Sequence, residues 1–340
     1  MVGMVIGMLG IIVMMQVFAL AEGQKRATTG GGDAQSNGAI ALYGLQRDLR
    51  QAGYGISDVN LIGFSVQLRA GVTLPAIAPL TINPKKSDGT DLIPPGDDNT
   101  DTLLVLYGNA NAAPQGDSIT AQPALAVTTY TVMASGSFAA DDQVVAVPKT
   151  CLSPCTLVMD KVSGNPVGLN IPVTTGDPDH PAMSNGRLYN LGSKPKIWAY
   201  AIRNGNLTSC DYMANDCGAA GNKDDAAVWV PIANNIVSIR AQYGKDTTTP
   251  MDGIVDAYNQ TNPATACDWI KTSAVRIALV ARNGNLERDP VTTSALTWAG
   301  TASVPIDLSD DGNWQNYRYK VFETVIPLRN IAWIGVQTGC

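Results

Sequence analysis

The chain has 340 residues, of which 45% are hydrophobic and only 15% are charged, so it can form one large domain or two lobes around a real core. Its formal net charge of −6 and its short basic runs disfavour nucleic-acid binding. A single histidine, His180, disfavours most acid–base, triad and zinc chemistry, because these reactions draw on histidine. We therefore expect a protein that is not an enzyme and has no nucleic-acid partner.

Residues 1–21 form an uncharged apolar run in which only Gln16 is strongly polar. As a helix rising 1.5 Å per residue, this run would span about 31 Å, which is close to the thickness of the bilayer hydrocarbon core. A signal peptide would start with basic residues and carry a shorter apolar run. The pattern therefore predicts a helix that is retained as a transmembrane or filament-core segment. The pair Gly3 and Gly7 permits close helix approach, although membrane helices also tolerate glycine without such a role.

Residues 22–55 are predicted to continue this helix in amphipathic form. We expect a break or bend at residues 30–32, because three consecutive glycines are costly inside a helix. The run Gly53-Tyr54-Gly55 is expected to end the helix. Small and apolar residues recur at three- and four-residue steps, so they form one stripe that must pack on a globular part. The stripe consists of Ala34, Gly38, Ala41, Leu42, Leu45, Leu49 and Ala52.

Residues 56–340 are predicted to form a β-rich globular head, so the expected fold class is α+β with the long helix laid on an antiparallel sheet. Two five-residue runs, 203–207 and 282–286, repeat the sequence Arg-Asn-Gly-Asn-Leu. Asn-Gly between apolar runs is a strong hairpin signal, and the match is too short to indicate a duplicated domain. The expected strands are 103–107, 143–147, 156–159, 197–203, 207–212, 236–243, 273–283 and 317–328.

The six cysteines are an even number in a chain with a membrane anchor, which favours disulfides in an oxidising compartment. Six cysteines allow fifteen pairings, and a metal or redox pair is the alternative for the two cysteines of the 151–155 run. Short separations favour two local bridges, and elimination leaves a third that would tie the C-terminus to the sheet. The expected bridges are Cys151–Cys155, Cys210–Cys217 and Cys267–Cys340.

A carboxylate-bearing loop follows the expected strand 236–243. Asp246, Asp252 and Asp256 could supply side-chain oxygens to calcium, and Gly253 would allow the tight bend that calcium loops need. Pro250 stands where a further oxygen donor would help, so an acidic surface turn is the alternative. Calcium is the single cofactor that the sequence suggests.

Several of these segments, taken in order along the chain, resemble the PilW-type minor pilins of type IV pili. No one motif is unique to that family, but their order covers both ends and much of the middle of the chain. The residues that carry the resemblance are MVGMVIG (1–7), residues 16–18, 22–26 and 28–31, QRDLRQAGYG (46–55), DTL (101–103), IVSIRAQYGKD (236–246), VRIALVAR (275–282) and PLRN (327–330).

The resemblance implies a structural subunit of a type IV pilus-like filament that assembles through its N-terminal helix. It would be either a priming or tip subunit or the main repeating subunit. The partners would be other pilin subunits, of the same or a related chain. The subunit would wait in the bacterial inner membrane and then join an extracellular pilus, where a C-terminal disulfide is common. Removal of a leader and methylation of the new N-terminus are implied by the resemblance alone.

The helix-core role predicts contacts between equivalent regions of neighbouring subunits. Two alternatives belong to other classes of protein. One is a membrane-tethered binding module or adhesin that does not polymerise, and the other is an anchored hydrolase, which the single histidine disfavours. The residues expected to make the helix contacts are Val2, Ile6, Leu9, Val13 and Val17.

Overall fold

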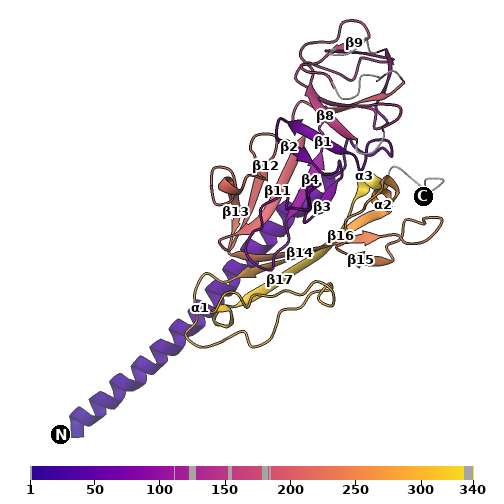
Figure 1. The fold of residues 1–340 in the computed structure, drawn as a ribbon. Helices are drawn as coiled ribbons and strands as arrows, with labels where there is room; N and C mark the ends of the chain where they lie inside the picture. The colour runs from indigo at the N-terminus through magenta and orange to yellow at the C-terminus, as the bar shows by residue number, and fades with distance from the viewer. Residues whose placement is uncertain are drawn as a thin grey trace.

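A computed structural model describes residues 2–110, 112–121, 128–151, 155–177, 183, 185–332 and 340 of the chain. His180 lies outside the described residues. A single long helix runs into a body of β-strands, and part of the helix projects beyond it (Figure 1). The predicted α+β class is confirmed. Within the described residues the strands form three sheets rather than the single sheet expected, and one strand pair is parallel.

The helix α1 (Val2–Gln51) is continuous, so the break expected at residues 30–32 is absent from the structure. Glycine is used here for close approach to the sheet. A Cβ atom on Gly30 would lie 3.1 Å from the Cβ of Asn283, and one on Gly38 would lie 2.1 Å from Cε2 of Phe322. Packing of this helix face on the head offsets the roughly 1 kcal/mol that each glycine costs relative to alanine.

The small and apolar stripe predicted along α1 does face the head. Ala34, Ala41, Leu45, Leu49 and Ala52 are buried in one core with residues of two sheets, and Leu42 packs against that core while partly exposed. The 3.6-residue period of the sequence therefore identified the docked face correctly.

A four-stranded antiparallel sheet covers the middle of α1. Its inner face contributes Ile239, Ile277 and Leu279 to the shared core. A second, smaller core that includes Trp298 lies over Ala278 and Val280, the alternating residues of the same central strand. The strand order is β15 (Ala257–Asn259), β14 (Ile236–Lys245), β16 (Thr272–Arg282) and β17 (Tyr319–Pro327).

A five-stranded antiparallel sheet packs beside the C-terminal half of α1. Leu103, Val105 and Tyr200 face the helix, whereas Leu104, Leu106 and Ala199 point to a second core on the other side. This alternation is the two-residue period of a strand that is buried on both faces. The order is β13 (Val230–Asn234), β12 (Asn206–Asp211), β11 (Lys196–Arg203), β4 (Leu103–Tyr107) and β3 (Leu80–Ile82).

An eight-stranded sheet extends away from the helix to the end of the molecule that is farthest from the N-terminus (Figure 1). Its outer part has a core of its own around Tyr130, Val144 and Leu188. The order is β2 (Val72–Leu74), β1 (Ser65–Arg69), β8 (Thr156–Lys161), β7 (Gln143–Val147), β10 (Arg187–Gly192), β5 (Asp117–Ala121), β6 (Thr129–Val132) and β9 (Asn170–Pro172). The short helices are α2 (Ala266–Ile270), α3 (Arg329–Ala332), η1 (Ala220–Asn222) and η2 (Trp314–Asn316).

The two Asn-Gly runs adopt different structures. Asn204 and Gly205 both have positive φ angles, 52° and 70°, and they close the hairpin between β11 and β12 as predicted. Asn283-Gly284 does not form the hairpin turn that was expected. β16 pairs instead with β17, and the Asn283 side chain is fully buried and accepts a hydrogen bond from the backbone N–H of Arg318 at 2.9 Å. Residues 282–286 therefore begin a long segment that covers one face of the four-stranded sheet.

We expect a Gly38→Val variant to unfold about 2 kcal/mol more easily, because the added side chain would displace the Phe322 ring from the helix–sheet contact. Gly31→Val is the matched control, since a Cβ at Gly31 meets nothing within 4 Å. Urea unfolding of the detergent-solubilised chain measures both variants. Equal losses of stability would show that helix propensity, and not close approach, explains the glycine at position 38.

Candidate functional site

The N-terminal half of α1 is an apolar rod that projects from the head (Figure 1). Four of the predicted contact residues, Ile6, Leu9, Val13 and Val17, have 57–64% of their surface exposed. The fifth is Val2, whose side chain lies outside the described part of the chain. The helix is long and apolar enough to cross a membrane, and its most apolar 18-residue stretch is not buried against the rest of the chain. An apolar surface of this size needs lipid or protein around it.

The C-terminal half of α1 is joined to the five-stranded sheet by a carboxylate. Asp48 accepts a hydrogen bond from the Tyr200 hydroxyl at 2.6 Å and from the Tyr107 hydroxyl at 3.4 Å. Burial and the neighbouring Asp48 charge raise the pKa of Tyr107 to about 12, and the same two causes raise the pKa of Tyr200. The sequence placed Asp48 off the packed stripe, so this contact was missed. It ties the C-terminal half of α1 to β4 and β11.

A second apolar feature lies on the docked half of α1. Ile40 and Tyr43 have 65% and 70% of their surface exposed, and Arg47 beside them is exposed too. They lie on the helix face away from the buried stripe, because at about 100° per residue Tyr43 is about 160° from Ala41 and Leu45, and Ile40 is about 100° and 140° from them. The sequence could have indicated this pair, since two large apolar residues interrupt the polar face of an otherwise amphipathic helix.

The acidic loop 246–256 is organised by its own backbone. Asp246 is 2% exposed and accepts hydrogen bonds from the N–H groups of Asp252 at 2.8 Å and Gly253 at 2.6 Å, and from Thr248. Burial would raise the pKa of Asp246, but these hydrogen bonds hold it below its ordinary value. Asp256 accepts from the Thr247 N–H at 2.7 Å.

The carboxylates that were expected to bind calcium are therefore engaged with the loop itself. Among the residues that the structure describes, no group of three or more histidine, cysteine, aspartate or glutamate side chains could hold a metal ion. The geometry fits the surface turn better than the calcium loop.

Excess EDTA should therefore leave the melting temperature unchanged, whereas Asp246→Ala should cost about 2 kcal/mol, because it leaves several backbone N–H groups without an acceptor. Asp252→Ala is the matched control. Its carboxylate accepts one hydrogen bond, from the Ile254 N–H, at an exposed position. Thermal unfolding with and without chelator measures all three chains. A melting temperature that falls in EDTA and recovers with added calcium would contradict the surface turn and support calcium binding by this loop.

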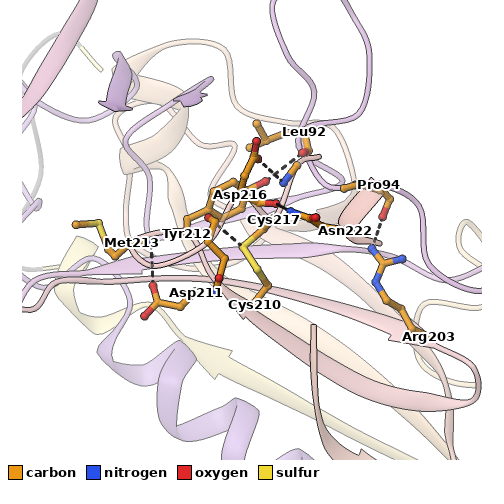
Figure 2. Close-up of a disulfide and its surroundings, with 12 residues drawn as sticks. Leu92, Pro94, Arg203, Cys210, Asp211, Tyr212, Met213, Asp216, Cys217 and Asn222 are labelled. Carbon is orange, nitrogen blue, oxygen red and sulfur yellow. Dashed lines mark hydrogen bonds between the residues drawn. A yellow bond between two sulfur atoms is a disulfide. The ribbon is translucent and has the colours of Figure 1, made fainter. Parts of the chain in front are cut away.

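The six cysteines form three disulfides, Cys151–Cys155, Cys210–Cys217 and Cys267–Cys340, which is the pairing given in the sequence analysis. Cys210 and Cys217 close a loop after β12 (Figure 2). In that loop the Tyr212 hydroxyl donates to the Leu92 carbonyl at 3.0 Å, and Asn222 donates to the Asp216 carbonyl at 2.9 Å. The Tyr212 bond holds the loop against the segment between β3 and β4, and the Asn222 bond joins the loop to the residues that follow it.

One stretch of the chain contains most of the β11–β12 hairpin, the four-stranded sheet and the segment that covers that sheet. This stretch, residues 199–330, matches the family model described as type IV pilus-assembly protein W. The resemblance to PilW predicted from the sequence motifs is thus confirmed for this stretch, and the match supports a pilus-related subunit.

A type IV-like pilin from Thermus thermophilus aligns with this chain at 11% sequence identity and a TM-score of 0.33, over 87% of this chain and 96% of that one. No match was found among the curated proteins.

Proposed function

We propose that this chain is a structural subunit of a type IV pilus-like filament, assembled through the N-terminal half of α1. The observation that carries the proposal is the exposed apolar rod, which continues as one helix into a β-rich, disulfide-bonded head. The match of residues 199–330 to a pilus-assembly family supports it.

The rod suits two environments, a lipid bilayer and a bundle of similar helices. Before assembly it anchors the subunit in the inner membrane with the head outside. In the filament its apolar surface is covered by neighbouring helices instead. Because both environments are apolar, the exchange costs little hydrophobic free energy, and close packing decides the balance.

The outer face of the docked helix provides a second contact. Ile40 and Tyr43 project away from the head, so they remain available when Ala41 and Leu45 are buried. A neighbouring subunit whose rod packs against this one would approach along that face. The partners are therefore other pilin subunits, of the same or a related chain.

The test is the distribution of the chain along sheared filaments, measured with gold-labelled antibodies against the head. Labelling along the whole length identifies a main repeating subunit, and sparse labelling at the ends identifies a priming or tip subunit. Absence of label from filaments that assemble normally would contradict the proposal and favour a membrane-tethered module that does not polymerise.

A further inference from the structure

A cleft of about 1090 Å³ lies between the eight-stranded sheet and two loops, one that follows β3 and one that follows β12. One wall is formed by β1 and β2, and the facing walls are the segments around residues 85–88 and 212–220. Its volume is slightly above the range of about 300–1,000 Å³ that is usual for small-molecule sites. In Figure 1, β1 and β2 lie far from the N-terminus, so the cleft stays accessible when the rod is covered.

The strand wall presents polar side chains in register. Gln67 on β1 and Thr73 on β2 are cross-strand partners, so their side chains lie side by side on the cleft face. The alternate residues Val66 and Leu74 are fully buried on the opposite face. Within the described part of the chain, the Gln67 amide and the Thr73 hydroxyl have no hydrogen-bond partner. One cleft wall therefore offers uncommitted donors and acceptors.

The cleft carries little net charge. Lys85 and Lys86 line it together with Asp88 and Asp216, and Lys85 forms an ion pair at 2.5 Å with Asp91, which lies outside the lining. With Asp91 counted, two lysines face three carboxylates, and a net charge of −1 gives little attraction for a polyanion or a polycation. The complementary ligand is therefore uncharged, and it needs many groups that both donate and accept hydrogen bonds.

The walls are held in place before any ligand arrives. The Arg69 guanidinium, on β1, donates to the carbonyls of Tyr212 and Asn215 at 2.5 Å each, which joins the strand wall to the loop closed by Cys210–Cys217 (Figure 2 shows the loop). A rigid site loses less conformational entropy when it binds a ligand. Phe64 is a half-buried lining residue that also packs against the core beneath the cleft.

We propose that this cleft binds a neutral oligosaccharide. Sugar hydroxyls both donate and accept hydrogen bonds, which suits the Gln67 amide and the Thr73 hydroxyl, and a neutral ligand suits the low net charge of the cleft. A peptide fits less well, because β2 is only three residues long and its pairing with β1 contains a bulge, so it is a poor template for an added strand.

The test uses the full chain in a detergent that contains no sugar. Maltotriose, cellotriose and tri-N-acetylchitotriose are screened by saturation-transfer difference NMR, and the best binder is titrated calorimetrically. We expect at least one to bind, with an affinity that does not change between low and high salt. Gln67→Ala should weaken binding about tenfold, the effect of losing about one well-made hydrogen bond. Gln35→Ala, an exposed glutamine on α1, is the matched control and should bind as the unchanged chain does.

Thr73→Val, at an exposed position, is the second variant in case Gln67→Ala does not fold, and it should also weaken binding. Three results would overturn the proposal. They are no binding of any of the three sugars, unaltered binding by both cleft variants, and displacement of the sugar by an unrelated extended peptide at equal concentration. None of these results bears on filament assembly, which the antibody labelling tests separately.

Discussion

An Ile6→Lys variant is expected to lose incorporation into filaments while its head folds normally. Ile6 lies in the exposed apolar half of α1 and is 64% exposed in the isolated chain, so its environment is supplied by lipid or by other subunits. A lysine placed centrally in an apolar helical environment costs about 3 kcal/mol, and a bundle core offers less room than a bilayer surface for the ammonium group to reach water. The amount of variant chain in sheared filaments, relative to the unchanged chain, measures the loss.

The matched control for this prediction is Ile254→Lys. Ile254 is 63% exposed, almost the same as Ile6, but it lies in the acidic loop of the head. We expect this variant to be incorporated normally, and we expect both variants to melt at the temperature of the unchanged chain in detergent. Normal incorporation of Ile6→Lys would contradict the role of the helix in the filament core, and a lowered melting temperature would show that Ile6 also stabilises the head.

Replacing both Cys267 and Cys340 by alanine should lower the free energy of unfolding by about 4 kcal/mol. This disulfide joins α2 to the C-terminal residue across a sequence separation of 73 residues, so its loss gives the unfolded chain the freedom of a long loop. Cys340 also packs against the main core, which places the chain end beside the sheet that supports α1. Urea unfolding of the detergent-solubilised chain under non-reducing conditions measures the change.

The control is the double replacement of Cys151 and Cys155, whose separation is only four residues. The same loop-entropy relation gives a loss of about 2 kcal/mol for so short a loop. A double variant of Cys267 and Cys340 that is no less stable than this control would show that the C-terminal bridge does not act through loop closure.

Local patterns in the sequence were sufficient for the helix and for many strands. The stripe from Ala34 to Ala52 has the period of a helix face, and β4 and β7 were predicted with the bounds they have in the structure. The turn Asn204-Gly205 was predicted because both residues readily adopt positive φ angles. These features depend on residues that are close together in the chain, so they can be predicted without knowing the tertiary structure.

The tertiary structure decided how these elements are used. Gly30 and Gly38 do not interrupt α1, because Asn283 and Phe322 come close enough to make glycine the residue that fits. Asn283-Gly284 is not a hairpin, because Asn283 pairs with Arg318. Each outcome depends on a contact between residues far apart in sequence.

Among the candidate sites, too, some could be predicted from the sequence and others depend on tertiary contacts. The apolar rod was evident from composition alone, since an uncharged run of its length has few other uses. The sequence suggested a calcium loop at Asp246, but the folded loop directs its own N–H groups at that carboxylate. The cleft beside Gln67 had no sequence signal, because its walls come from three separate segments. The sequence by itself determined the long helix, eight of the seventeen described strands and the apolar surface, which follow from near neighbours and composition. Only the tertiary structure decided which polar groups are satisfied and which face a cleft, because that depends on how distant segments pack together.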